Sequence, residues 1–250
     1  MHIKSAITVI AALLLSACTT VPPKEASDNY LSTNFKAPQA GALIVLLPPG
    51  KAGAKELEAG NTFTQQQLYT QLTQAGYRVA LLNSANYEEL HKQAVDAVGG
   101  IYDSSTGALR KEASAQATSS LAKRICTQLE CTHVLIQRLV VRKAEVGAQR
   151  AEWDGQSRSI EKFNTGGNMT HFKGSTTGMS LELTALSANG EVAFKRYGGI
   201  SLPHEFDLIK NESKLRRDLF RNDEEVSDGV RIAIRPFLKP QVDTQPIKGS

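Results

Sequence analysis

The chain alternates between short apolar runs and amphipathic segments, and the first of these predict a strand, a helix and a second strand. Residues 42–47 form a continuous apolar run closed by a Pro-Pro-Gly turn, which is typical of a strand buried on both faces. A helix follows that Asn61 or Thr62 can cap and that Gly76 ends. Residues 77–82 give the second strand, and this short spacing favours a parallel pair with a right-handed crossover.

Two more helices are expected before the next strand. Apolar residues between 87 and 98 fall on one helical face, and the segment ends at the glycine pair 99–100. A second segment, 117–129, keeps the same helical period. The first half of the chain therefore predicts helices packed on a parallel sheet.

In the second half the apolar period changes from helical to extended. Residues 134–141 begin a long extended segment, and 179–186 alternate between apolar and polar residues as in a strand with one wet face. Asn189-Gly190 then separates this strand from the apolar residues 192–194, which is a strong signal for a β-hairpin. This half therefore predicts antiparallel strands.

A final helix closes the pattern. Asn222, with Glu225 three residues later, is typical of a capping box before apolar residues at helical spacing between 226 and 234, and Pro236 ends the helix. The fold class predicted is α/β (α+β): a mixed sheet with helices packed on it, antiparallel strands in the second half and one closing C-terminal helix.

Residues 144–178 fit no regular element. They are rich in glycine and carry scattered apolar residues, and a structureless segment of this length is unusual inside a compact domain. The sequence leaves two interpretations of this irregular arm: an extended hairpin or a mobile loop.

The N-terminus has the features of an export signal. Lys4 provides a positive charge, residues 6–15 form an apolar stretch, and Ser16-Ala17 are the small residues that a signal peptidase requires. Ten apolar residues are too few to span a bilayer as a helix, which needs about 20. An ordinary secretory leader followed by a chance cysteine is the alternative to the interpretation that follows.

The stretch Leu-Ser-Ala-Cys at 15–18 resembles the lipobox of bacterial lipoproteins. The resemblance implies that residues 1–17 are removed, that Cys18 becomes the first mature residue, and that Cys18 carries a diacylglycerol and a further fatty acyl chain. Three chains make release from a membrane negligible. Thr19 stands where members kept at the inner membrane usually carry Asp, so the implied location is the periplasmic face of the outer membrane.

Composition divides the mature chain into three parts. Residues 18–40 are rich in Pro, Ser, Thr and charged residues and lack a hydrophobic period, which predicts a flexible tether. Residues 41–240 are expected to form a single α/β domain, and residues 241–250 a disordered tail.

The order of elements is similar to that of the curli-secretion lipoprotein family, the related N-terminal domain of the Tol translocation protein, and the penicillin-binding-protein activator lipoproteins. The resemblance covers about residues 41–237 and rests on no signature motif, so it assigns no functional residue. It departs from the secretion family at 144–178, where charged residues and glycine interrupt the alternation that a membrane-spanning hairpin requires. It departs from the activators in having a shorter tether.

The charge of the chain is not that of a protein whose partner is nucleic acid. The formal net charge is +4, and removal of residues 1–17 takes away Lys4 and no acid, which leaves +3. This charge is not gathered into one basic run as in a dedicated nucleic-acid binder.

Cys126 and Cys131 are the remaining cysteines. In an oxidising periplasm two cysteines of one exported domain most often pair, so a structural disulfide is predicted. Free buried thiols and a metal site with His133 as third ligand are the alternatives, although the spacing is not CxxC and no fourth ligand is evident.

No catalytic constellation is found in the sequence. Residues 174–178 place threonine where a GxSxG nucleophile would stand, and the Pro-Gly-Lys at 49–51 lacks both the first glycine and the hydroxyl residue of a phosphate loop. The chain is therefore expected not to be an enzyme and to use no cofactor and no metal.

Two stretches are candidate partner contacts. Tyr102 and Asp103 lie in a polar segment between two helices, where a locally capped turn is the alternative interpretation. Lys214, Arg217 and Arg221 form a basic stretch that a solvated helix face would also explain.

The sequence thus predicts a non-enzymatic, lipid-anchored envelope protein that binds or assembles other envelope proteins. A subunit of an oligomeric secretion or envelope complex, including a homo-oligomer, is the alternative. An anchored hydrolase that uses the 144–178 arm as a lid ranks below both.

Overall fold

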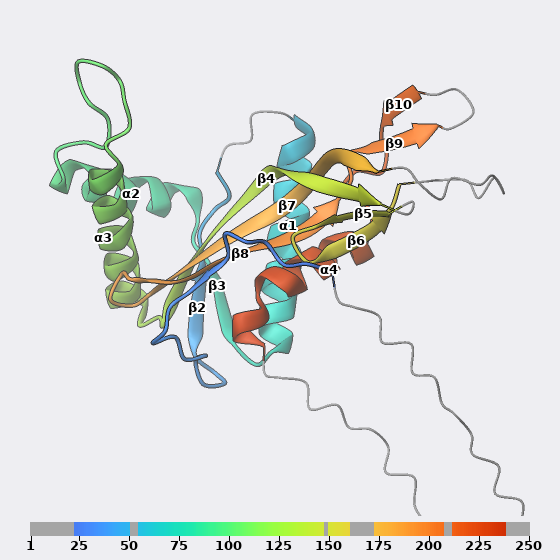
Figure 1. Cartoon of the computed structure of the whole chain (residues 1–250). Coiled ribbons are helices and arrows are strands. Elements are labelled where there is room, and N and C mark those ends of the chain that lie inside the picture. The colour runs from blue at the N-terminus through green and yellow to red at the C-terminus, as the bar shows by residue number, and fades with distance from the viewer. Residues whose placement is uncertain (1–22, 51–54, 148–149, 161–172, 208–211, 239–250) are drawn as a thin grey trace, which may run out of the picture.

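The computed structural model describes residues 23–50, 55–147, 150–160, 173–207 and 212–238. Within these ranges one mixed sheet of eight strands forms the centre of the molecule, with the strand order β1-β8-β7-β4-β2-β3 and the β5–β6 hairpin attached to β4 (Figure 1). The strands of this sheet are β1 (Tyr30–Leu31), β2 (Leu43–Leu46), β3 (Arg78–Leu81), β4 (His133–Gly147), β5 (Arg150–Trp153), β6 (Gln156–Ser159), β7 (Gly174–Ser187) and β8 (Val192–Ser201). Strands β9 (His204–Asp207) and β10 (Glu212–Leu215) form a separate antiparallel pair.

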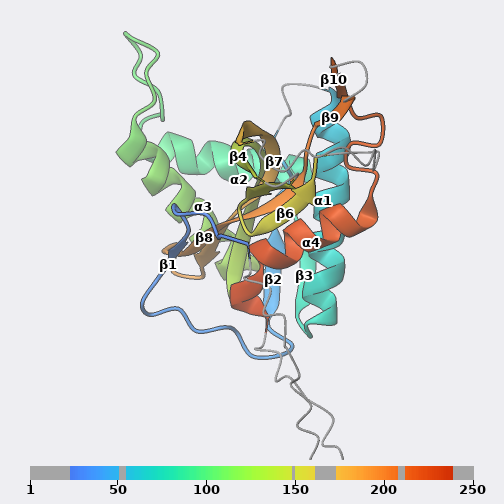
Figure 2. The same ribbon diagram turned by 45° about the vertical axis from the view of Figure 1, so that its right-hand side comes forward.

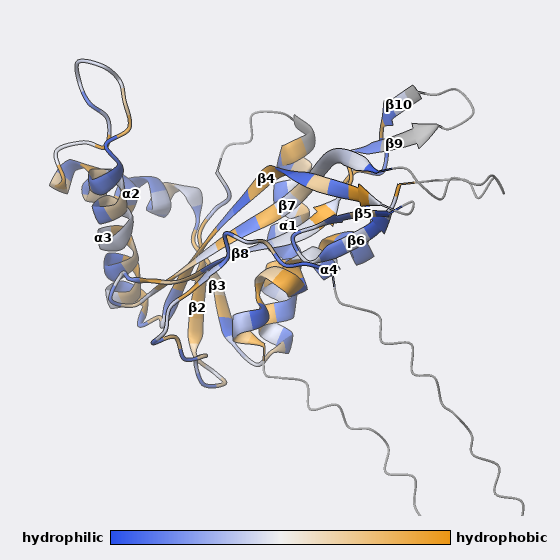
Figure 3. Ribbon diagram, in the orientation of Figure 1, coloured by the Kyte–Doolittle hydropathy of each residue, from blue (hydrophilic) through white to orange (hydrophobic). Residues whose placement is uncertain are grey.

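Helices cover both faces of the sheet. Side chains of α1 (Lys55–Gln74) and α4 (Asp223–Ala233) share a core with Ile44 and Leu46 of β2, whereas α2 (Ser84–Ala97) and α3 (Lys111–Leu129) share a second core with Val45 and Leu47. Successive residues of a strand point to opposite faces, so the continuous apolar run at 42–47 supplies both cores. Figure 2 shows α2 and α3 on one side of the sheet and α1 and α4 on the other, and Figure 3 shows β2 as an apolar strand between them. The predicted fold class is confirmed.

The first half of the sheet is parallel, as predicted. β2 pairs in parallel with β3 (Ile44 opposite Val79) and with β4 (Ile44 opposite His133). Helix α1 connects β2 to β3, but it begins at Lys55, before the predicted cap at Asn61 or Thr62. Asn61 and Thr64 are buried within this helix, and the Thr64 hydroxyl donates to the carbonyl of Gly60. Satisfying that hydroxyl within the helix lets a polar residue stay in a helical segment.

The second half is antiparallel, and the hairpin predicted at Asn189-Gly190 is confirmed. β7 and β8 pair across this turn, and Gly190 has a φ of 77°, which favours glycine. A second antiparallel ladder joins β4 to β7, from His133 opposite Ser187 to Val146 opposite Gly174. This ladder joins the two central strands of the sheet.

The prediction of an irregular arm at 144–178 is wrong for the residues that the structure describes. β4 and β7 extend into this region as one paired ladder, and β5 and β6 form a hairpin that folds back from the end of β4. Trp153 closes this hairpin against the sheet, because its indole lies where side chains at Gly178 and Gly199 would stand. The extended hairpin is therefore the better of the two interpretations, and residues 161–172 lie outside the described ranges.

The closing helix α4 begins as predicted but its cap differs from a capping box. The Asn222 side chain accepts hydrogen bonds from the backbone N–H groups of Glu224 and Glu225. The Glu225 carboxylate does not return to Asn222. Arg216 and the Ser201 hydroxyl donate to it instead, which ties the first turn of α4 to the end of β8.

The prediction of a flexible tether at 18–40 does not hold for residues 23–40, which pack on the sheet. Tyr30 and Leu31 pair with Lys195 and Phe194 at the edge of β8, and Phe35 packs against the core shared with α1 and α4. A strand of two residues is too short to produce a recognisable apolar period in the sequence. Cys18, the expected signal peptide at 1–17 and the expected tail at 241–250 lie outside the described residues.

Candidate interaction surfaces

Charged side chains hold residues 23–40, which we call the N-terminal segment, to the rest of the domain, which we call the body. Both oxygens of the Asp28 carboxylate accept from the Arg142 guanidinium, at 2.7 and 3.1 Å, and Arg142 also donates to Asp154 at 3.0 Å. The hydrogen bonds from Arg142 lower the pKa of Asp28 below its ordinary value. A bidentate pair of this kind fixes orientation as well as adding energy, so Asp28 sets how the segment lies on the sheet.

Four further contacts hold this segment on either side of Asp28. The backbone N–H of Tyr197 donates to the Asn29 side chain at 2.9 Å, and the N–H of Gly155 donates to the Lys24 carbonyl at 2.9 Å. Between them, Glu25 accepts from Arg196 at 2.6 Å and also from Arg235. The body therefore holds the chain from Lys24 onward, six residues after Cys18.

A charged cluster lies on β4, β7 and β8 beside this segment. Glu182 accepts from Arg138 at 2.6 and 2.9 Å, from the Tyr197 hydroxyl at 3.0 Å, and forms an ion pair with Lys195 at 3.1 Å. Burial of the carboxyl opposes its ionisation, but the hydrogen bonds from Lys195, Arg138 and Tyr197 outweigh burial, so the pKa of Glu182 is lowered. A carboxylate stabilised as an anion in this way is a poor general base.

His133 is buried in an aromatic cluster rather than placed for metal binding. Its ring lies against Phe237 with the centroids 5.4 Å apart and against Phe35 at 6.1 Å, and it is 8% exposed. Burial lowers its pKa from 6.5 to about 4, so the neutral imidazole is the stable form. Its Nδ1 has no hydrogen-bond partner among the described residues.

The disulfide predicted between Cys126 and Cys131 is present. It joins the last turn of α3 to Cys131, two residues before the start of β4, across a Cα–Cα distance of 4.4 Å, and Glu130 ends α3 in a left-handed conformation. Both sulfurs are thereby used, so the alternatives of free thiols and of a metal site do not apply to this pair. In the part of the chain that the structure describes, no group of three or more His, Cys, Asp or Glu residues could hold a metal ion.

The segment between α2 and α3, residues 98–110, forms a rigid projecting loop that we call the Tyr102 loop (Figure 1, green). Tyr102 and Leu109 face each other in a β-bridge and are 61% and 49% exposed. One oxygen of Asp103 accepts from the backbone N–H and the hydroxyl of both Ser105 and Thr106. These bonds, that from the Ser105 hydroxyl foremost, lower the pKa of Asp103.

The base of the Tyr102 loop is also fixed. The Arg110 guanidinium donates to the carbonyls of Gly99 and Gly100 at 3.0 and 2.9 Å. Asp103 thus has the local turn role that the sequence left as an alternative, whereas Tyr102 is displayed to solvent together with Leu109. The contribution of Leu109 carried no sequence signal, because it depends on a bridge across seven residues.

The basic candidates do not lie on a helix face. Lys214 lies in β10, and Arg217 and Arg221 are exposed in the turns before α4. Arg216, which belongs to the same basic stretch of the sequence, makes structural contacts instead, with Asp218 at 2.8 Å and Glu225 at 3.0 Å. A partner contact through Lys214, Arg217 and Arg221 stays a prediction.

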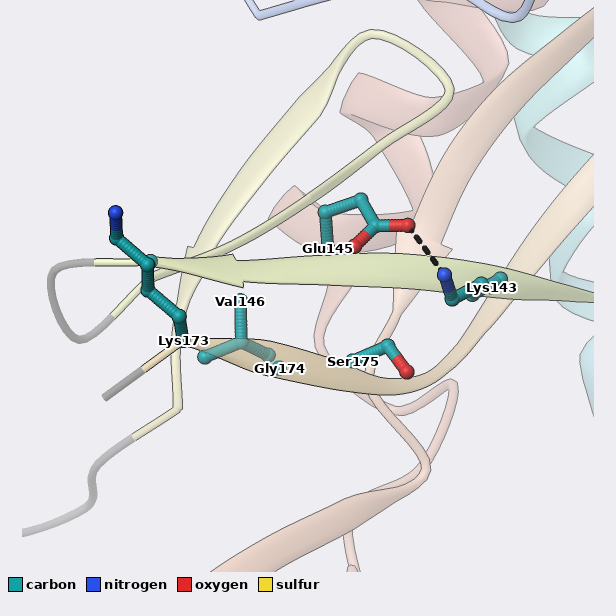
Figure 4. A pocket seen from close by; sticks show the side chains of 7 residues that line it. Lys143, Glu145, Val146, Lys173, Gly174 and Ser175 are labelled. Carbon is teal, nitrogen blue, oxygen red and sulfur yellow. Dashed lines mark ion pairs between the residues drawn. The ribbon is translucent and has the colours of Figure 1, made fainter.

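Neither of two hollows on the described surface gathers groups for chemistry. The larger, of about 600 Å³, lies at the far end of the β4–β7 ladder, where Lys143 and Glu145 form an exposed ion pair at 2.7 Å (Figure 4). The smaller, of about 240 Å³, lies between α2 and α3 and is lined by Leu90, Ile125 and Leu129 together with polar residues.

Among the described residues, no helix combines the length and hydropathy that crossing a bilayer requires.

Comparisons with known proteins add one distant likeness. No protein-family model and no curated protein sequence matches the chain. Among solved structures, a PelC variant from Paraburkholderia phytofirmans, described as a dodecamer, is 8% identical. That match covers 83% of this chain and 96% of the other, with a TM-score of 0.37, which is too low to carry an argument.

Proposed function

We propose that this protein is a non-enzymatic, lipid-anchored protein of the bacterial envelope that holds its α/β body against the membrane and binds another envelope protein through the Tyr102 loop. The observation that carries this proposal is the docked N-terminal segment. Lys24, whose carbonyl accepts a hydrogen bond from the backbone N–H of Gly155, lies six positions after Cys18, and six positions reach at most about 20 Å. An anchor at Cys18 therefore keeps the body within about that distance of the lipid surface.

Among the described residues, the buried or paired ionisable groups serve the fold, which is compatible with a binding role. The carboxylates Asp28, Asp154 and Glu182 are each engaged by arginine or lysine, and the buried imidazole of His133 lies among aromatic rings. Groups held in this way stabilise the fold, whereas a catalytic group needs access to a substrate.

The Tyr102 loop has the features of a protein contact. Tyrosine is enriched at energetically important positions of interfaces, and it loses little conformational entropy on binding. The bonds to Asp103 and from Arg110 fix the loop before any partner arrives, which lowers the ordering cost. Figure 1 shows the loop projecting at the α2–α3 side of the molecule, away from α4 and β6.

Replacement of Tyr102 and Leu109 by alanine is expected to weaken capture of the partner at least tenfold. Loss of one hot-spot side chain costs on the order of 2 kcal/mol of binding free energy, and about 1.4 kcal/mol is a factor of ten. A photo-crosslinking residue at position 102 of the membrane-anchored protein identifies the partner by the mass of the adduct. Pulldown of that partner by the wild type and by the Tyr102→Ala, Leu109→Ala variant then measures the loss of binding.

The control for this experiment is Tyr69, an exposed tyrosine on α1, replaced by the same crosslinking residue. An adduct at position 102 with another protein supports the proposal, and an adduct with a second copy of the chain identifies the oligomeric alternative. Equal and negligible adducts at positions 102 and 69 would contradict a binding role for the loop.

A further inference from the structure

Cations gather where the N-terminal segment meets the end of α4. Arg231 in the last turn of α4 and Arg235 in the 3-10 turn after it (Arg235–Phe237) are one helical turn apart, and their side chains are 64% and 50% exposed. Lys24 is exposed beside the β5–β6 turn, where its carbonyl accepts from Gly155. Two less exposed arginines, Arg158 and Arg196, complete the set that we call the anchor patch.

Carboxylates neutralise only part of the anchor patch. Asp228 is shared by Arg158 at 3.1 Å and Arg231 at 2.5 Å, and Glu25 is shared by Arg196 and Arg235. Five cations over two carboxylates leave a local charge of +3, as large as the net charge of the whole mature chain.

The other acids of α4, Asp223, Glu224 and Glu225, all lie in its first turn. Glu225 is bound by Arg216 at the start of the helix. Glu224 lies seven residues before Arg231, about 10 Å along the helix axis. The excess positive charge is therefore concentrated at the C-terminal end of α4, beside Lys24.

We propose that the anchor patch binds the phosphate groups of anionic phospholipids in the membrane that holds the Cys18 lipid. This inference rests on the proposed function, because the anchor brings the patch to the surface: Lys24 lies within about 20 Å of a lipid at Cys18. Guanidinium groups suit phosphate because they bind it with two parallel hydrogen bonds. A cation near an anionic membrane strengthens binding by about fivefold, so a few cations orient a body that the anchor already confines.

The test uses the mature chain from position 18 with Cys18→Ser, which keeps every residue that the structure describes and removes the lipid. We expect this protein to sediment with vesicles that contain 30% phosphatidylglycerol in phosphatidylcholine, to lose binding as salt is raised, and not to sediment with pure phosphatidylcholine vesicles. Equal binding to both vesicles, or binding to neither, overturns the proposal.

Two variants locate the binding surface. Arg231→Gln with Arg235→Gln is expected to lower the vesicle partition coefficient about 10- to 30-fold, and Lys24→Gln alone about fivefold. The control is Lys123→Gln with Arg124→Gln, which removes the same charge from the exposed surface of α3 and is expected to change partition by less than about threefold, as loss of distant charge does. Equal losses in the two double variants would mean that vesicle partition depends only on the net charge of the protein, and that result overturns the proposal.

The outcome of the vesicle assay does not depend on whether Cys18 is lipidated. The vesicle assay contains no lipidated protein, so a chain that proves not to be lipidated at Cys18 leaves its result unchanged. If the patch instead binds an acidic protein surface, vesicle binding is absent while Arg231→Gln with Arg235→Gln still lowers recovery of crosslinked partners, and the lipid proposal is then wrong.

Discussion

Gly198→Ala is expected to destabilise the protein by at least about 3 kcal/mol. A Cβ atom at position 198 would lie 1.9 Å from the carbonyl oxygen of Gly229, 2.9 Å from its carbonyl carbon and 3.1 Å from the backbone nitrogen of Ala233. Strand β8 and helix α4 meet here backbone to backbone, so no flexible side chain can move aside. Overpacking commonly costs about 1 to 3 kcal/mol, and a clash with backbone belongs at or above the upper end of that range.

The measurement is equilibrium denaturation followed by far-UV circular dichroism, with Gly147→Ala as the matched control. Gly147 ends β4, and a Cβ there would meet nothing within 4 Å, so its free energy of unfolding is expected to change by less than about 1 kcal/mol. Gly229→Ala tests the same contact from the helix, because its Cβ would lie 2.7 Å from the Gly199 carbonyl oxygen. Wild-type stability in both Gly198→Ala and Gly229→Ala would contradict the described packing of α4 on β8.

The free energy of unfolding is expected to fall by about 3 kcal/mol as the pH falls from 6.5 to 4, because of His133. The pKa of His133 is about 4 in the folded protein and 6.5 for an ordinary histidine. Between these values the unfolded chain binds a proton that the folded chain does not, so stability rises with pH in this window and is fully present above pH 6.5. A gap of about 2.5 pH units corresponds to about 3 kcal/mol.

His133→Phe tests this assignment, since phenylalanine suits the contacts with Phe35 and Phe237 and cannot titrate. The variant is expected to lose most of the pH dependence between 6.5 and 4.5, measured by denaturation at each pH. His91→Gln, which removes a histidine stacked on Tyr87 of α2, is the control and should keep the wild-type profile. A His133→Phe profile as steep as that of the wild type would show that another group is responsible.

The carboxylates of Asp28 and Glu182 act mainly below this window. The pKa values of Asp28 and Glu182 are lowered by their arginine and lysine partners, so the stability they contribute is lost only as the pH falls below about 4.5. Because Phe35 belongs to the N-terminal segment, protonation of His133 also weakens the packing that docks this segment on the body.

The sequence predicted those parts of the fold that local chemistry specifies. The apolar run at 42–47 is buried on both faces, the Asn189-Gly190 turn joins β7 to β8, and Asn222 caps α4. Each of these signals acts within a few residues, so it can be recognised without knowledge of the tertiary contacts.

The parts that the sequence did not predict depend on contacts between distant segments. The charged residues of β4 break the apolar alternation, yet Arg142 is satisfied there by Asp28, which is 114 residues away. The polar segment 24–29 was predicted to be a tether because its partners, among them Arg142, Arg196 and Arg235, are 114 or more residues distant. A pattern read along the chain cannot show such pairs.

The candidate contacts also divide into those that the sequence predicted and those that depend on the fold. The cysteine pair was predictable, because the predicted export signal implies an oxidising compartment and only two cysteines remain in the predicted domain. Tyr102 could be singled out but Leu109 could not, and Asp103 proved to stabilise the turn rather than to be displayed. The anchor patch was hidden, since Lys24, Arg196 and Arg235 come together only in the fold.

The proposed function depends most on the lipid at Cys18, which lies outside the described residues. Mass spectrometry of the tryptic N-terminal peptide of protein purified from membranes tests this lipid directly. We expect a peptide covering residues 18–24 that begins at Cys18 and carries a diacylglycerol on the sulfur and an acyl chain on the amine. A peptide that begins at another residue, or an unmodified Cys18, would contradict it.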